Sequence, residues 1–288
     1  MISKNNYIGL FLALSSGVGF MASNTLAGVS YQFGTNPLTV TATRFILPAI
    51  LLIWILRLDG ISLALPKRIT IFSFLLGLIT VIYNLALLSA IEILPLAIAI
   101  LIFYLFPILT GLMLATLSWQ KLSLTAVITG LIAFSGIALA LGVEFANLKG
   151  WGIIYATLAA VGLATVCVIS SRLMDNEDAR VVTFYMCISA TLILIIICSV
   201  SGDFETPKIN SGWIAILASH AFYAYAMITF YIAISSIGAR ETTFYNNIEP
   251  IMAVGAGYLF LNQNLSILQY LGISIVLVAL LYNGKKVS

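Results

Sequence analysis

The chain has 288 residues, of which 61% are apolar and only 8% are charged, and its mean hydropathy is +1.12. A soluble domain carries about 25% charged residues, so this composition excludes a soluble globular protein and predicts an integral membrane protein. The net charge of +3 is too small to indicate nucleic-acid binding.

Ten apolar stretches follow one another along the chain, separated by charged residues, Pro, Gly and Asn. Because a membrane-spanning helix needs roughly 20 apolar residues, we predict an all-α integral membrane protein with ten transmembrane helices and no separate catalytic domain. The first stretch lacks a clear signal-peptide cleavage site and is expected to be retained. The stretches cover residues 7–32, 36–57, 69–91, 94–117, 122–143, 150–172, 179–201, 211–236, 239–262 and 265–283.

Positive charge is unevenly distributed between the connections. Of the 13 Lys and Arg residues, only Lys149 and Lys208 fall in connections on the side opposite to the two termini, and Arg44 lies inside a stretch. Cytoplasmic loops retain Lys and Arg, so both termini are predicted to be cytoplasmic. The expected location is the inner (cytoplasmic) cell membrane.

No cofactor and no metal site are expected from the sequence. Cys167, Cys187 and Cys198 lie inside apolar stretches, without zinc or disulfide spacing, and His220 is the single histidine. The chain has no GxxxxGK[ST] phosphate-binding loop. It also lacks the Gly-x-Ser-x-Gly and HExxH patterns, so an intramembrane enzyme is the least favoured class.

An internal repeat appears when the chain is shifted on itself by 143 residues. The shift predicts two halves, residues 1–146 and 147–288, with five spans each. An odd number of spans requires the halves to be inverted relative to one another, an architecture typical of transporters with a midplane cavity. The shift aligns Ala90-Ile91 with Ala233-Ile234, Pro107-Ile108 with Pro250-Ile251, and Gln120, Leu122 and Ser123 with Gln263, Leu265 and Ser266.

Three segments resemble the repeated EamA-like domain of the drug/metabolite transporter superfamily, and the resemblance covers essentially the whole chain. They are Thr43-Arg44-Phe45, the segment from Phe106-Pro107-Ile108 to Trp119-Gln120-Lys121-Leu122, and the segment from Glu249-Pro250-Ile251 to Asn262-Gln263-Asn264-Leu265. Both turns have Gln, at Gln120 and Gln263, where the family often has Glu. The resemblance implies transport of small metabolites such as amino acids, nucleosides or nucleotide-sugar-like compounds, in either direction.

The ninth stretch is the most polar of the ten. At helical spacing Thr242, Tyr245, Asn246 and Glu249 share one face, which is too costly to expose to lipid and is therefore expected to line a cavity. Asn247 lies beside this face. Glu249 is the candidate ligand for a substrate amine or a coupled proton, because ionisable groups inside membranes are commonly functional. The alternative is a structural carboxyl group that tethers helices.

Pro107 and Pro250 lie in the middle of the fourth and ninth stretches. Each removes one helical hydrogen bond and frees a carbonyl four residues earlier, on Phe103 and Asn246. These carbonyls could bind a substrate ammonium group. The favoured interpretation is that the two prolines only kink their helices.

Arg44 lies about two turns inside the second stretch. Its expected partner is Glu92 or a substrate carboxylate, and a structural anchor at the membrane interface is an equal alternative.

Further wall residues are expected from four other stretches. His220 and Tyr223 share one face of the eighth stretch, and Phe103 and Tyr104 occupy the repeat positions of Asn246 and Asn247. An aromatic side facing an amide-rich side suits a small molecule with an apolar body and a polar head. The same residues could equally hold helices together by hydrogen bonds. The remaining candidates are Asn24, Tyr83 and Asn84.

Together these features predict a secondary transporter that moves amino acids or related zwitterionic or cationic metabolites by alternating access, with a proton as candidate coupling ion. The alternative is a passive facilitator or channel for small solutes. The expected partners are the small-molecule substrate and the lipid bilayer. The fifth and tenth stretches would be the natural contact surface of a homodimer.

Overall fold

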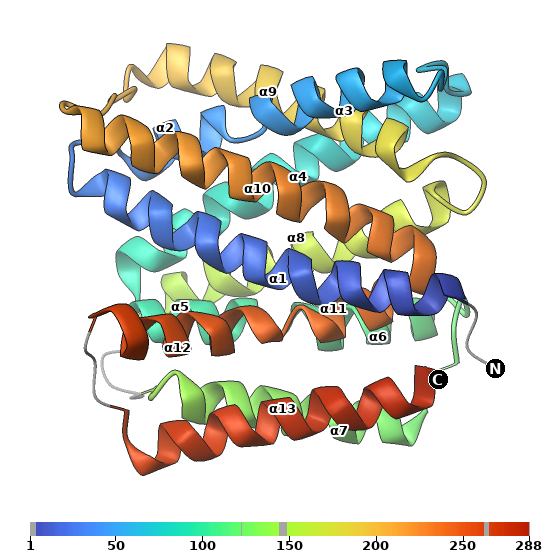
Figure 1. The fold of residues 1–288 in the computed structure, drawn as a ribbon, viewed down its shortest axis with the longest axis vertical. Coiled ribbons are helices and arrows are strands. Elements are labelled where there is room, and N and C mark those ends of the chain that lie inside the picture. The colour runs from blue at the N-terminus through green and yellow to red at the C-terminus, as the bar shows by residue number, and fades with distance from the viewer. Residues whose placement is uncertain (1–3, 122, 144–148, 262–264, 288) are drawn as a thin grey trace.

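The computed structural model describes residues 4–121, 123–143, 149–261 and 265–287. Within these ranges the chain forms thirteen helices and no strand, arranged as a bundle of roughly antiparallel elements (Figure 1). The helices are α1 (Lys4–Tyr31), α2 (Pro37–Thr43), α3 (Ile46–Leu58), α4 (Lys67–Ile93), α5 (Leu96–Phe103), α6 (Phe106–Thr116), α7 (Leu124–Ala140), α8 (Gly150–Leu173), α9 (Ala179–Ser201), α10 (Asn210–Ile237), α11 (Ala239–Tyr245), α12 (Ile248–Leu261) and α13 (Ile267–Val287).

Three of the predicted stretches are broken into two helices. α2 and α3 are separated at Arg44–Phe45, α5 and α6 at Tyr104–Leu105, and α11 and α12 at Asn246–Asn247. The second helix of each pair has a proline in its first turn, where the missing N–H would have no helical partner in any case. Sequence reasoning predicted kinks at two of these places, and the structure shows short interruptions of two residues there.

The carbonyl of Asn246 is not left free by Pro250. It accepts the backbone N–H of Glu249 at 3.0 Å, so the local chain turn replaces the bond that the proline removes. This arrangement weakens the idea that the backbone oxygen of Asn246 is a ready-made ammonium ligand.

Seven helical runs among the described residues are long and apolar enough to cross a membrane. The broken pairs α2/α3 and α5/α6 each count as one run, and the others are α1, α4, α8, α9 and α10. α7 and residues Ile267–Tyr282 of α13 are shorter apolar helices. The chain is thus an all-helical, multi-pass membrane protein, while the count of ten spans stays a prediction.

The helices pack in pairs that match the predicted internal repeat. α1 packs on α10, and the corresponding helix of the second half, α8, packs on α4. In the same way α5 and α6 contact α8, whereas α11 and α12 contact α1. α7 and α13 pack on each other. These contacts of one half therefore have counterparts in the other.

Glycines bring α7 and α13 into backbone contact. A Cβ atom added to Gly272 would lie 2.4 Å from the backbone nitrogen of Ala140 and 2.6 Å from the carbonyl oxygen of Gly136. Small residues permit such close approach where lipid provides no hydrophobic driving force between helices. The pair is consequently a tightly packed, largely apolar unit at one edge of the bundle (Figure 1).

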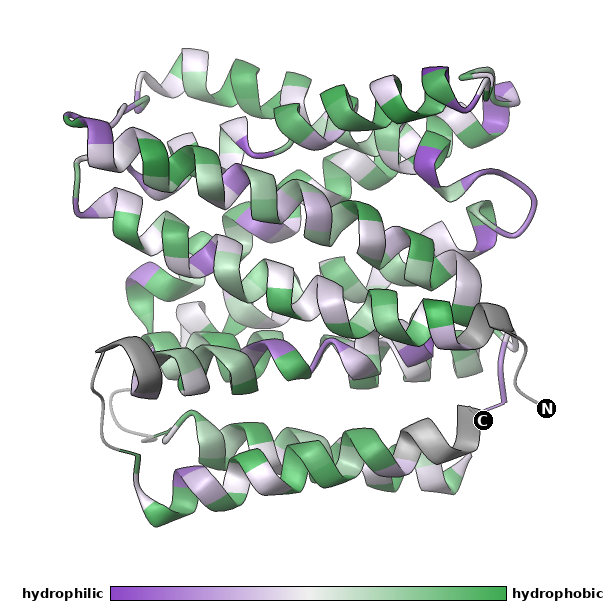
Figure 2. Ribbon diagram, viewed as in Figure 1, coloured by the Kyte–Doolittle hydropathy of each residue, from purple (hydrophilic) through white to green (hydrophobic). Residues whose placement is uncertain are grey.

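Hydrophilic residues gather at the ends of the bundle, and a few lie in its middle (Figure 2). The start of α1 and the end of α13 lie at the same end of the bundle (Figure 1). Arg180, in the first turn of α9, pairs there with Asp59 at 2.5 Å and with Asp178 at 2.8 Å. Hydrogen bonds from Arg180 lower the pKa of Asp178, which lies just outside the helix. Which side of the membrane this end faces stays a prediction.

Candidate functional site

A cavity of about 110 Å³ lies at the centre of the bundle, where the broken helices meet. It brings together eight of the candidate residues from sequence: Asn24, Arg44, Tyr83, Asn84, Phe103, Tyr223, Asn246 and Glu249. The rest of the wall is apolar or aromatic: Phe20, Leu87, Phe106, Leu163, Met227, Phe230 and Tyr231. We call this space the central cavity.

Glu249 forms the acidic end of the central cavity. Its Oε1 accepts a hydrogen bond from Nδ2 of Asn24 at 2.9 Å, and the hydroxyl of Tyr104 also bonds its carboxylate. Glu249 lies in the first turn of α12, where the helix dipole favours a negative charge. None of the ion pairs formed by the described residues includes Glu249. Two neutral donors and a helix terminus therefore hold the carboxylate.

Arg44 forms the basic end. Its guanidinium donates to Oδ1 of Asn84, whose Nδ2 in turn donates to the carbonyl of Thr80 at 2.8 Å. The guanidinium carbon also lies 4.5 Å from the ring centroid of Tyr223. The predicted ion pair between Arg44 and Glu92 is wrong. The break after α2 turns Arg44 toward the middle of α4, whereas Glu92 is exposed in the last turn of that helix.

Much of the cavity wall is built from residues 143 positions apart, the offset of the internal repeat. Equivalent positions of the two halves therefore face the same space, as expected for a site on a pseudo-twofold axis. In three pairs one member is polar and the other is apolar. The pairs are Phe20 with Leu163, Asn84 with Met227, Leu87 with Phe230, Phe103 with Asn246, and Phe106 with Glu249.

Five candidate residues do not line the central cavity. Thr242 and Tyr245 are buried in α11, before the break, and the hydroxyl of Thr242 bonds the carbonyl of Gly238 at 2.8 Å. Of the four residues expected to share one polar face, Asn246 and Glu249 line the central cavity, whereas Thr242 and Tyr245 do not. His220 lies outside the wall, with Nε2 2.8 Å from the hydroxyl oxygen of Thr43.

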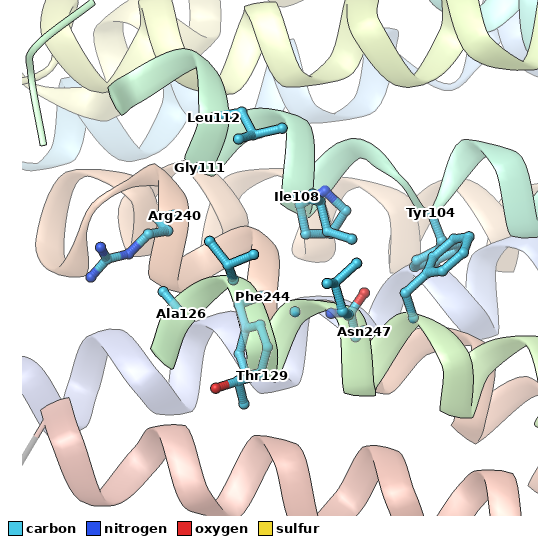
Figure 3. A pocket seen from close by; sticks show the side chains of 14 residues that line it. Tyr104, Ile108, Gly111, Leu112, Ala126, Thr129, Arg240, Phe244 and Asn247 are labelled. Atoms are coloured by element: carbon cyan, nitrogen blue, oxygen red, sulfur yellow. The ribbon is translucent and has the colours of Figure 1, made fainter. Parts of the chain in front are cut away.

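The last two of these candidates, Tyr104 and Asn247, line a second cavity of about 240 Å³ between α5, α6, α7 and α11 (Figure 3). They are a repeat-related pair, so this space also lies between equivalent elements of the two halves. Its wall is mostly apolar, and includes Pro107, Ile108 and Phe134. We call it the lateral cavity.

Five apolar residues of the central wall were missed by sequence reasoning: Phe20, Leu87, Phe106, Leu163 and Phe230. The repeat offset supplies a signal for one of them, because Phe106 is the repeat partner of Glu249. A hydrogen bond behind the wall was also missed: Nδ2 of Asn246 donates to Oγ of Ser16 at 3.0 Å. Gln263 and Leu122, which belong to the aligned turns, lie outside the described residues.

The fold and the central cavity define a multi-pass membrane protein of the transporter class. The EamA-like transporter family model matches residues 7–142 and again residues 150–284. The chain belongs to this family, and is a membrane transporter of small solutes.

A crystal structure described only as "Crystal structure of protein" has the same fold. It superposes with a TM-score of 0.79 at 20% sequence identity, and the match covers 97% of each chain. No curated protein matches this sequence.

Proposed function

We propose that the protein is a secondary transporter of small zwitterionic or cationic metabolites, amino acids and related compounds among them. It works by alternating access between two inverted halves of five spans each, in the cell membrane with both termini cytoplasmic. The observation that carries this proposal is the pair of opposite charges in one cavity. Glu249 and Arg44 both line the central cavity, yet no ion pair joins them.

A zwitterion fits this separation of charge. Its ammonium group would bind beside Glu249 and Asn24, and its carboxylate beside the guanidinium of Arg44. The aromatic wall, with Tyr83 stacked on Phe103 at a centroid distance of 6.5 Å, would cover an apolar body.

The carboxyl group of Glu249 is also the proposed site of proton coupling. A membrane-embedded carboxylate without a cationic partner gains stability by binding either a substrate ammonium or a proton. Competition between the two would couple substrate release to protonation.

Asn24 indicates the direction in which the cavity opens. Its side chain is exposed, and it lies in the second half of α1, away from the end of the bundle where the termini lie. At the opposite end, Arg180 of α9 forms an ion pair with Asp59, the residue that follows α3, and a second one with Asp178. We propose that this contact between the halves opens when the cavity becomes accessible from the side of the termini.

The test compares metabolites inside and outside cells that produce the wild type or Glu249→Gln. A metabolite displaced by the wild type is then assayed in proteoliposomes with an imposed pH gradient. We expect Glu249→Gln to lower flux by roughly tenfold or more, the effect of removing a hydrogen-bonded charge from a binding site, and to abolish its dependence on the gradient. Normal flux and normal pH dependence in a folded Glu249→Gln protein would contradict the proposal.

Glu92→Gln is the matched control, because Glu92 is exposed and lines neither cavity.

Counterflow separates a carrier from a passive facilitator, since only a carrier is accelerated by substrate on the opposite side. We expect such trans-stimulation in the wild type and in Glu92→Gln.

A further inference from the structure

The lateral cavity is separate from the central cavity but shares a wall with it. Tyr104 lines the lateral cavity, while its hydroxyl bonds Glu249 in the central cavity. The cavity is bounded on its other side by α7, and two of its wall residues, Leu112 and Leu131, are 42% and 51% exposed. In a membrane-embedded chain this exposed rim faces lipid, so the cavity can be reached from the bilayer.

One polar atom in the lateral cavity has no partner. Asn247 is 3% exposed, and its buried Oδ1 has no hydrogen-bond partner among the described residues. Figure 3 shows the amide among the side chains of the cavity, on the side of Ile108 and Tyr104. A buried acceptor without a donor is costly, so a ligand that supplies an N–H or O–H group gains this bond on entering.

The charged group at the rim is already neutralised. Arg240 lines the lateral cavity, but its Nε donates to Oε1 of Glu241 at 2.9 Å and its Nη2 bonds the same oxygen. The hydroxyl of Thr129, also in the wall, bonds the carbonyl of Thr125. The cavity therefore offers one free acceptor and no free charge among the groups that line it.

We propose that the lateral cavity binds a small uncharged amphiphile from the bilayer, whose N–H or O–H group donates to Oδ1 of Asn247. The size of the cavity, about 240 Å³, is slightly below the usual range of small-molecule sites, which begins at about 300 Å³, and it is too small for a two-chain lipid. Its apolar wall accepts the body of the ligand, and the orphan amide oxygen selects for a donor. This inference does not depend on the substrate proposed for the central cavity.

Two small probes test the role of the donor. 4-Fluoroaniline is uncharged at neutral pH and has N–H donors, and 4-fluorotoluene replaces the amino group by a methyl group of similar size. Binding to the purified full chain in lipid nanodiscs is followed by ¹⁹F NMR line broadening, after subtraction of the partition into empty nanodiscs. We expect the wild type to bind 4-fluoroaniline roughly three- to tenfold more tightly than 4-fluorotoluene, the effect of one hydrogen bond.

Two variants locate the probe. Asn247→Leu keeps the side-chain size and removes the acceptor, and should abolish the preference for 4-fluoroaniline. Gly130→Leu should fill the cavity and eliminate binding of both probes, since a Cβ atom at Gly130 would lie 3.5 Å from its nearest neighbour, Ile108, and can enter without a clash. Gly255→Leu is the control for a leucine in a helix, because a Cβ atom there meets nothing within 4 Å.

Unchanged binding of 4-fluoroaniline to folded Asn247→Leu or to folded Gly130→Leu would overturn the proposal. So would the absence of binding above empty nanodiscs. If Asn247→Leu does not fold, as judged by gel filtration, the preference of the wild type for 4-fluoroaniline and the behaviour of Gly130→Leu decide the question.

Discussion

The broken helices α5/α6 and α11/α12 have the same backbone design and opposite chemistry. Each pair is interrupted shortly before a proline, and each interruption borders the central cavity. In the first half this region presents Phe103 and Phe106, whereas the equivalent residues of the second half are Asn246 and Glu249. The repeat thus preserved the shape of the chain while its side chains diverged, so polar groups of one half face aromatic groups of the other.

The equivalent helices α4 and α10 have also diverged, but here the polar residue belongs to the first half and the apolar residue to the second. Asn84 of α4 holds Arg44, while its repeat partner Met227 of α10 is apolar. The first half therefore supplies the basic end of the central cavity, and the second half supplies Glu249. A substrate that contacts both ends bridges the two halves, which is the condition for coupling their relative movement to binding.

Replacing Asn84 by the residue of its repeat partner tests this comparison most strongly. In Asn84→Met the guanidinium of Arg44 loses its acceptor and its position beside the cavity. We expect flux of the transported solute in proteoliposomes to fall by roughly tenfold, because hydrogen bonds to charged groups have the largest effects.

Met227→Leu provides the control, since Met227 lines the same cavity without a charged partner and the two apolar side chains have similar volume. Equal loss of flux in both variants would show that cavity packing, rather than the position of Arg44, is what matters.

The interruption between α11 and α12, which contains Asn246, is expected to depend on Ser16 for stability. Ser16→Ala removes the acceptor of the buried amide of Asn246, whose bond to Oγ of Ser16 measures 3.0 Å. Bonds between membrane helices average about 0.6 kcal/mol and reach about 1.7 kcal/mol, so the loss should lie in this range. Unfolding in mixed micelles with increasing SDS measures it.

Ser15→Ala is the matched control, because the hydroxyl of Ser15 bonds only the carbonyl of Leu12 in its own helix. If the two variants are equally stable, the bond between α1 and the break adds nothing, and the polar and aromatic breaks are equivalent in stability.

The smallest effect is expected for the ion pair between Asp178 and Arg180, beside the contact of Arg180 with Asp59 that joins the two halves. The pKa of Asp178 is lowered from its usual value of 3.8 by hydrogen bonds from Arg180. A lowered pKa in the folded state means that this contribution is present above pH 3.8 and is lost as the pH falls through the lowered pKa. Asp178→Asn should reduce stability at neutral pH by less than about 1 kcal/mol and flatten its decline below pH 4.

Unfolding profiles of the wild type, Asp178→Asn and Asp203→Asn between pH 3 and pH 7 measure this effect. Asp203 is exposed and forms none of the ion pairs among the described residues. A decline below pH 4 that is as steep in Asp178→Asn as in the wild type would assign the acid sensitivity to other carboxylates.

The candidate site was partly predictable from sequence, because polar residues in apolar stretches are few. Eight of the thirteen candidate binding residues meet in the central cavity, among them Glu249 and Arg44. Thr242 and Tyr245 of the expected polar face are buried in α11 and do not line this cavity. Asn246 and Asn247 are consecutive, so their side chains point about 100° apart and the two amides line different cavities.

The sequence alone determined the membrane class, two of the three places where a stretch is interrupted, and the family. Hydropathy is a sum over local residues, proline acts on its own turn, and the repeat is an alignment of the chain with itself. The partners of the charged residues were decided only by the tertiary structure. Arg44 bonds Asn84 instead of Glu92, and Glu249 bonds Asn24 and Tyr104, because helix packing sets which side chains meet across separations of 40 to 225 residues in the sequence.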